Sequence, residues 1–251
     1  STYIQNMRWF GGKARTVKQA TLTKVIPLVK STLPYCFLFV KMDYMIGDSE
    51  IYVLPVTFTE TSVSEEILQK NRWSAIAWVR QKGKNSMYLL HDGLADNHFC
   101  NLLLGIIARK QWVRVGEKGT IMGTATTAFG AFKKSLPDTP GTMVIESEQS
   151  NTSVIYDNQL ILKLIRRLTP GINPDFEIGK FLTDKKFPHT PHLAGGISFY
   201  PEKSTPMTLS TLHEYVPNQG DAWRYTLNSV NAFYENALAE KDRFTKILSQ
   251  G

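Results

Sequence analysis

Apolar residues in the first third of the chain occur in short runs that have the length of strands. The runs at 35–42 and 51–59 are rich in β-branched and aromatic residues, and a polar segment at 46–49 lies between them. Such a pair predicts a β-hairpin in which Gly47 takes a positive φ at the turn. A further short strand is expected at 87–90.

The first helical pattern lies at 96–110, where apolar residues repeat at intervals of three and four. These residues are Phe99, Leu102, Leu103 and Ile106. The next segment, 116–141, contains five glycines and two prolines. It predicts loops and short strands near a subdomain boundary.

The pattern becomes regular again after residue 142. Strands are expected at 143–146, 153–156 and 160–165, with a polar loop at 148–152 and a tight turn at 157–158.

A helix is expected at 175–184, since Pro174 suits the first position of a helix. A strand is expected at 208–216, and a last helix begins at about Ala222. Together these elements predict a mixed α+β protein.

The composition excludes several classes. The chain has 251 residues, of which 42% are apolar and 20% charged, so it is globular rather than disordered or collagen-like. No apolar run approaches the roughly 20 residues that cross a bilayer, and no secretory leader is visible. The first residue is Ser1 rather than Met. Cys36 and Cys100 are too few for a disulfide framework, so we expect buried thiols and a cytoplasmic location.

The net charge of +7 could indicate a nucleic-acid partner or a phosphorylated ligand. The basic residues are scattered, however, in pairs such as Lys133-Lys134 and Arg166-Arg167. A nucleic-acid footprint would cluster on one face, so a basic soluble surface is the better interpretation and no nucleic acid is expected.

The strand at 160–165 carries a lysine, Lys163, in the middle of an apolar run. A lysine in such a run needs an anionic partner or a route to solvent. The polar residues Ser150, Asn151, Thr152 and Ser153 precede it, and Glu177 lies on the helix that follows. Strand, polar loop, strand, lysine and helical glutamate follow one another as in the N-lobe of a protein kinase. The alternatives are a solvent-facing lysine and an ordinary surface carboxylate.

Three shorter patterns are rejected as kinase or nucleotide motifs. The segment 10–13 is not a Walker phosphate loop, because Ala14 stands where Ser or Thr would hold magnesium. The segment 91–93 is better explained as a strand end with an Asp-Gly turn. The segment 175–177 follows Lys163 by only twelve residues, too few for a catalytic loop between them.

Several longer motifs resemble those of bacterial maltokinases, including maltokinases fused to trehalose synthase. The opening signature is Arg8-Trp9-Phe10-Gly11-Gly12-Lys13-Ala14-Arg15. A phosphate-covering loop, a strand lysine, a helix segment and an inter-lobe hinge are matched by residues 148–153, 162–164, 171–179 and 214–223.

The resemblance implies ATP-dependent phosphorylation of maltose to maltose 1-phosphate, on the path from trehalose to glycogen-like glucan. It also implies a kinase-like fold that carries an N-terminal cap. In nucleotide binding, the phosphates would be covered by Gln149, Ser150, Asn151, Thr152 and Ser153. They would be bound by Lys163, which Glu177 would hold, and adenine would meet the backbone of Glu214 and Val216. The implied cofactors are ATP and Mg²⁺.

The expected organisation is a β-rich cap at 1–115, a kinase-like N-lobe at 116–216, and a hinge with the first C-lobe helix at 217–251. The family's His-Gly-Asp-x-His loop and its metal-binding Asp-x-Glu segment do not occur in the 251 residues. We therefore expect the N-terminal part of a longer enzyme, with the C-lobe absent and no activity on its own. No catalytic residue and no metal ligand is assigned in this chain.

Two other hypotheses stay open. The chain could be a non-catalytic module that binds a trehalose synthase partner and regulates or scaffolds it. It could also belong to related kinases of aminoglycosides or choline, although these lack the signature at 8–15. Trp9 and Phe10 within that signature are expected to be core anchors rather than ligand contacts.

Overall fold

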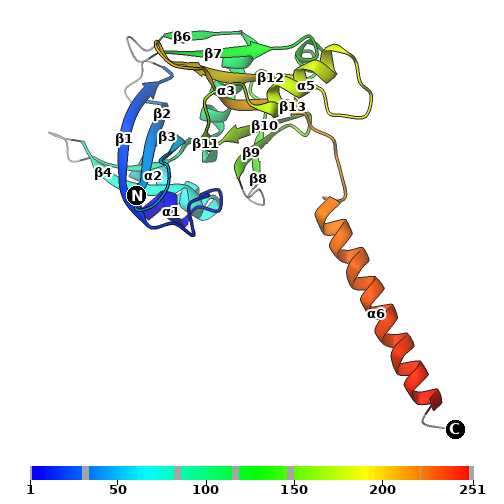
Figure 1. Cartoon of the computed structure of the whole chain (residues 1–251). Helices are drawn as coiled ribbons and strands as arrows, with labels where there is room; N and C mark the ends of the chain where they lie inside the picture. Colours follow the sequence, from blue (N-terminus) through cyan, green and yellow to red (C-terminus); the bar gives the residue numbers. More distant parts are fainter. Residues whose placement is uncertain are drawn as a thin grey trace. The chain divides into compact units, whose positions relative to one another are not determined.

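The computed structural model describes residues 2–29, 34–81, 86–114, 119–145, 150–220 and 222–248. The chain divides into two compact units, Ser1–Tyr215 and Val216–Gly251, and each is described by itself (Figure 1).

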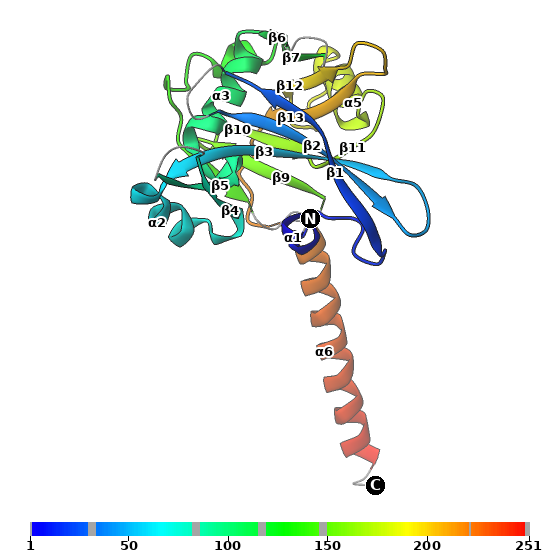
Figure 2. The ribbon, with the colours of Figure 1, turned by 90° about the vertical axis from the view of Figure 1, so that its left-hand side faces the viewer.

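The N-terminal part of the first unit is built on an antiparallel sheet, called sheet A. Its strand order is β1-β2-β3-β5-β4, and β11 pairs with β3. Figure 2 shows its long, curved strands. The strands are β1 (Val17–Pro27), β2 (Cys36–Tyr44), β3 (Glu50–Glu60), β4 (Ala75–Arg80), β5 (Met87–Asp92) and β11 (Arg167–Leu168). The helices beside them are α1 (Thr2–Asn6), α2 (Thr61–Lys70), η1 (Arg72–Ser74) and η2 (Gly93–Ala95).

A second antiparallel sheet, called sheet B, has the order β6-β7-β12-β13-β10-β9-β8. Its strands are β6 (Trp112–Arg114), β7 (Thr120–Ala125), β8 (Thr142–Ile145), β9 (Asn151–Tyr156), β10 (Leu160–Ile165), β12 (Leu193–Tyr200) and β13 (Met207–Glu214). A short helix, α4 (Phe129–Phe132), follows β7.

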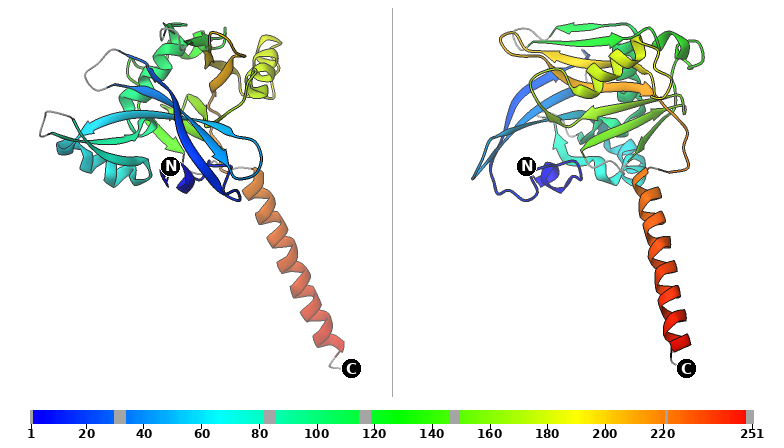
Figure 3. Two further views of the ribbon diagram at one scale, coloured as in Figure 1. Left: turned by 60° about the vertical axis from the view of Figure 1, so that its left-hand side comes forward. Right: turned by 45° about the vertical axis from the view of Figure 1, so that its right-hand side comes forward.

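Two helices cover opposite faces of sheet B: α3 (Asn97–Ala108) and α5 (Pro174–Asp184). Adjacent glycines of β12 show this, because neighbouring residues of a strand point to opposite faces. A Cβ on Gly195 would lie 2.6 Å from Ile107 of α3, and one on Gly196 would lie 2.8 Å from Phe176 of α5. The right-hand view of Figure 3 shows the yellow helix α5 over the strands.

The main hydrophobic core lies between the two sheets and includes α3. Side chains of β2 and β3, such as Phe39 and Val53, pack in one cluster with Leu162 and Leu212 of sheet B. A second cluster packs against β2 and β3 of sheet A and contains Trp9 and Phe10 of the N-terminal signature.

The second unit is formed by helix α6 (Ala222–Leu248). Several of its large apolar side chains are exposed: Trp223, Leu227, Val230, Tyr234 and Leu238. Over the described ranges, no helix combines the length and apolarity that a membrane crossing requires.

Most elements that the hydrophobic pattern predicted are present. The prediction of β10 is confirmed at both ends, and Gly47 has φ +86° in the β2–β3 turn. The turn at 157–158 has positive φ at both residues. Strand β12 was missed, because the paired glycines that let α3 and α5 approach interrupt its apolar pattern. Helix α2 and strand β4 were also missed. The mixed α+β class with antiparallel sheets and a β-rich N-terminal cap is confirmed.

Candidate functional site

Three polar residues form a row across the α5-facing side of sheet B. The strand register places Thr211 opposite Gly196 on one side and opposite Lys163 on the other, and Lys163 opposite Ser153. Directly opposed residues share a face of the sheet. The Lys163 row, defined as Ser153, Lys163 and Thr211, therefore starts beside the position where Phe176 of α5 contacts Gly196.

The hydroxyl groups on both sides of Lys163 are buried without a hydrogen-bond partner. Ser153 Oγ and Thr211 Oγ1 have no partner, and the two residues are 0% and 1% exposed. An unpaired buried hydroxyl costs about 1–3 kcal/mol, and each exception of this kind calls for an explanation. Lys163 is half-buried, and its register partners on both neighbouring strands carry these unpaired hydroxyls. Such a set of polar residues suits an anionic ligand.

Strand neighbours extend this surface toward the end of β13. Ile161 lies opposite His213, two positions along from Lys163. Burial lowers the pKa of His213, and the Lys163 charge lowers it further, against an opposing effect of Asp175. The imidazole is therefore neutral at physiological pH, and it packs against α5, where a Cβ on Gly179 would lie 3.3 Å from its Cε1.

The expected Lys163–Glu177 ion pair is not formed. Among the described residues, the ion pairs include neither side chain, and Glu177 is exposed on α5. Helix α5 begins at Pro174, and Glu177 lies exposed in its first turn. A pairing of Lys163 with Glu177 therefore stays a prediction. The acidic side chain whose charge acts at this end of sheet B is Asp175, through its effect on His213.

The predicted phosphate-covering loop is shorter than the sequence indicated. Asn151 and Thr152 lie in β9 rather than in a loop, Ser153 lies in this strand as expected, and Thr152 and Ser153 are buried. The β-branched residues that follow extend the strand by pairing with β10, which overrides the polar composition. Ser150 is exposed just before the strand. Gln149 lies outside the described residues.

The predicted hinge residues fall in different units. Glu214 ends β13, and its N–H donates to the carbonyl oxygen of His192. That N–H is therefore already used within the fold. Val216 is the first residue of the second unit and is described only with it.

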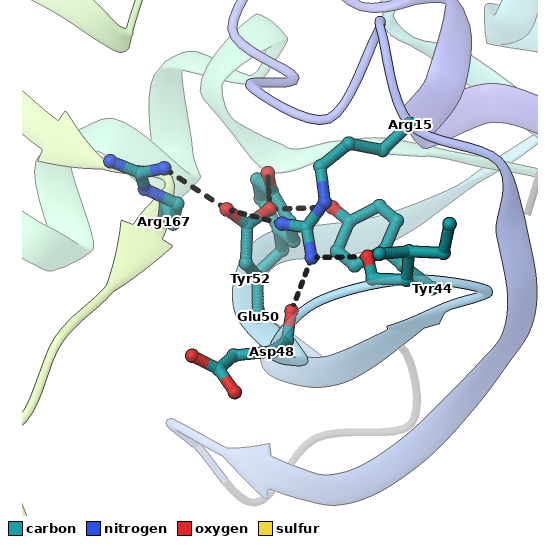
Figure 4. A network of polar contacts seen from close by, with 7 residues as sticks. Arg15, Tyr44, Asp48, Glu50, Tyr52 and Arg167 are labelled. Carbon is teal, nitrogen blue, oxygen red and sulfur yellow. Dashed lines mark hydrogen bonds and ion pairs between the residues drawn. The ribbon is translucent and has the colours of Figure 1, made fainter.

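A different polar cluster lies on sheet A and is completely paired (Figure 4). The Glu50 carboxylate accepts hydrogen bonds from Tyr44, Tyr52 and Arg167, at 2.7 Å from Tyr52 and 3.0 Å from Arg167, and it lies 3.4 Å from Arg15. Burial alone would raise the pKa of Glu50, but the three hydrogen bonds outweigh it and lower that pKa. We call Arg15, Tyr44, Glu50, Tyr52 and Arg167 the Glu50 cluster.

Several residues of the N-terminal signature pack around this cluster. Trp9 and Phe10 are 6% and 3% exposed and contact the Tyr52 ring, so both belong to the core, as expected. A Cβ on Gly12 would lie 2.3 Å from Tyr44 Oη, so only glycine fits this close approach. Arg15 stacks 3.5 Å above the Tyr44 ring and donates to the carbonyl oxygen of Asp48 at 2.6 Å.

The expectation that Arg166-Arg167 belongs to a basic solvent-facing surface is wrong for Arg166, which is 0% exposed. Its Nη2 lies 2.8 Å from Asp92 Oδ2, off the hydrogen-bonding direction, so the contact is an ion pair only. Its Nε donates to Thr152 Oγ1 at 2.9 Å. Arg166 thus joins β5 of sheet A to β9 of sheet B. The expectation of two buried thiols, Cys36 and Cys100, is confirmed.

Within the described ranges, no group of three or more His, Cys, Asp or Glu side chains could hold a metal ion. The site in sheet B therefore consists of one cation, two hydroxyls and apolar neighbours. Its lysine and hydroxyl groups can bind an anion.

Comparison with known proteins supports the resemblance for the N-terminal part of the chain. Residues 3–96 match the family model described as the maltokinase N-terminal cap domain. Among solved structures, a glucosamine kinase (crystal form B) is similar, with 16% sequence identity and a TM-score of 0.49. The match covers 92% of this chain and 44% of that kinase, so the chain spans less than half its length.

Proposed function

We propose that this chain supplies the nucleotide-binding part of an ATP-dependent maltokinase that converts maltose to maltose 1-phosphate. The observation that carries the nucleotide assignment is the Lys163 row, in which a half-buried lysine is paired in the sheet with two residues whose buried hydroxyls are unpaired. The match of residues 3–96 to the maltokinase cap supports the choice of reaction. A cytoplasmic protein of trehalose and glycogen metabolism is proposed on the same resemblance.

In this proposal Lys163 binds the α- and β-phosphates, since a fixed cation at that position is common to kinase-like N-lobes. The β8–β9 hairpin, with Ser150 and Asn151 at its described end, covers the phosphates, together with Gln149 as the resemblance implies. Ser153 and Thr211 gain partners when the site is filled.

The adenine is proposed to meet the backbone of Glu214 and Val216, as the resemblance implies. Glu177, although exposed here, is proposed as the partner of Lys163 only in the nucleotide-bound state, which requires α5 to shift. Domain boundaries are proposed at 115 and 216. Within the segment 1–115, helix α3 packs on sheet B and β6 is one of its strands.

Magnesium, when bound, would neutralise charge on the phosphates. Its ligands and the catalytic base are proposed to belong to the C-lobe of a longer enzyme, and a trehalose synthase is the proposed fused or associated partner. The 251-residue chain is therefore proposed to bind nucleotide without turning it over.

Isothermal titration of the purified chain with ATP tests the proposal. Binding is expected for the native chain and is expected to fall at least about tenfold in Lys163→Met, because a charge-assisted contact to phosphate is lost. The matched control is Lys180→Met, which removes an exposed lysine of α5 that pairs with Asp184 instead. Equal ATP binding by all three proteins would contradict the site. Maltose-dependent ATP turnover by the chain alone would contradict the proposed division of labour.

A further inference from the structure

A hollow lies where the N-terminal segment of the cap meets the end of the β8–β9 hairpin. It encloses about 430 Å³, including its open mouth, and both regions contribute to its wall. The cap supplies Met7, Arg8, Trp9 and Trp73, and the hairpin supplies Val144, Ile145, Asn151 and Thr152.

The body of the hollow is apolar and aromatic. Two indole rings, from Trp9 and Trp73, and the side chains of Met7 and Val144 line it. Such walls suit a flat apolar group, since aromatic side chains provide large contact area with little loss of conformational freedom.

The polar groups of the hollow are dominated by hydrogen-bond donors. Arg8 is exposed at the rim, and within the described part of the chain it has no ion pair. Thr152 is 7% exposed, and its Oγ1 already accepts from Arg166, which leaves its hydroxyl proton free to donate. The indole N–H of Trp73 is buried without an acceptor. Among the described lining residues none is acidic.

We propose that this hollow binds a small organic anion that carries a flat apolar body. The body packs between the cap and hairpin walls, and the anionic end accepts hydrogen bonds at Arg8 and the neighbouring donors. A bound molecule of this kind contacts the cap and the hairpin at once. The hollow does not include Ser153, Lys163 or Thr211, although its Asn151 and Thr152 also belong to the hairpin that is proposed to cover the phosphates.

Two probes that share a ring system and differ in charge test the proposal. Titration calorimetry with 2-naphthoate and with the neutral 2-naphthalenemethanol is expected to show binding of both at millimolar concentration. The anion is expected to bind about tenfold more tightly, as a charge-assisted hydrogen bond predicts. Equal affinity for the two probes, or no binding of naphthoate at millimolar concentration, would overturn the proposal.

Four variants test whether the probes bind in this hollow. Arg8→Gln removes an exposed side chain, so the fold is expected to persist, and the preference for naphthoate is expected to disappear. Arg80→Gln changes an exposed arginine of β4 that does not line the hollow, and the preference is expected to stay. Trp73→Leu is expected to weaken both probes, whereas Trp78→Leu is expected to weaken neither. Loss of the preference in Arg80→Gln, or its persistence in Arg8→Gln, would overturn the assignment.

Discussion

The Glu50 cluster of sheet A and the Lys163 row of sheet B are both polar, but their groups are paired to different degrees. In the Glu50 cluster one carboxylate receives two phenols and two guanidinium groups. In the Lys163 row the hydroxyls beside the ammonium have no partner. A network whose members are all satisfied stabilises a fold, whereas unpaired buried polar groups call for an explanation, of which a bound ligand is one.

The comparison also shows that a specific sequence motif can serve the packing of the fold rather than the binding of a ligand. The signature at 8–15 is long and specific, yet Trp9, Phe10 and Gly12 serve packing. Lys163 has little motif around it, yet it lies at the centre of the candidate site. The variants below therefore test the pairing of side chains through stability, and the NMR titration that closes the Discussion tests the unpaired region through ligand binding.

The largest loss of stability is expected from Arg166→Met. This change leaves Asp92 buried without its cation, and breaking a buried ion pair typically costs about 3–5 kcal/mol. Urea unfolding measures the loss. The double variant Arg166→Met with Asp92→Asn is expected to recover part of it, because the unpaired charge is gone. A loss below about 1 kcal/mol in the single variant would show that the pair is solvated.

A smaller loss is expected from Gly12→Ala. The added Cβ would lie 2.3 Å from Tyr44 Oη, and relieving such overpacking costs about 1–3 kcal/mol. The control is Gly130→Ala in α4, where a Cβ meets nothing within 4 Å. Thermal unfolding of both variants checks the prediction, and an equal effect of the two substitutions would contradict the close approach in the cap.

Glu50→Gln is expected to cost about 1–2 kcal/mol at neutral pH, since charge-assisted hydrogen bonds are replaced by neutral ones. The lowered pKa of Glu50 means that its stabilisation is present above the unfolded pKa and is lost as pH falls through the folded pKa. The native and variant free energies of unfolding should therefore converge in acid. If the free energies of unfolding of the native chain and of Glu50→Gln differed by the same amount down to low pH, the pairing of the carboxylate would be contradicted.

The smallest effect is expected at His213. Its lowered pKa means that the unfolded chain binds protons more readily than the folded chain, so its contribution to stability declines as pH falls below about 6.5. His213→Gln should flatten the pH dependence of unfolding in that range. His98→Gln, an exposed histidine of α3, should leave it unchanged; a flattening by His98→Gln alone would refute the assignment.

Some elements could be predicted from the hydrophobic and polar pattern of their own residues. Strand β10, helix α3 and the turn at 157–158 were predicted from their own residues. Strand β12 was hidden because Gly195 and Gly196 reflect the approach of two helices, which lies outside the strand's own sequence.

In both polar regions, the pairing of residues that lie far apart in the chain could not be predicted from the sequence. Nothing near Glu50 indicates that Arg167, more than a hundred positions away, supplies its partner. Arg166 looked like half of a basic surface pair and proved to be buried. In the candidate site, Lys163 was predicted from its apolar strand, whereas Thr211 beside it could be found only from the register of β10 and β13.

The most direct measurement is the amide spectrum of the labelled protein by NMR during titration with ATP. The account predicts that the amides of Ser153, Lys163 and Thr211 shift, while those of Tyr44, Glu50 and Tyr52 do not. Shifts confined to the Glu50 cluster, or no shift in either region, would contradict the claim that the unpaired row in sheet B is the nucleotide site.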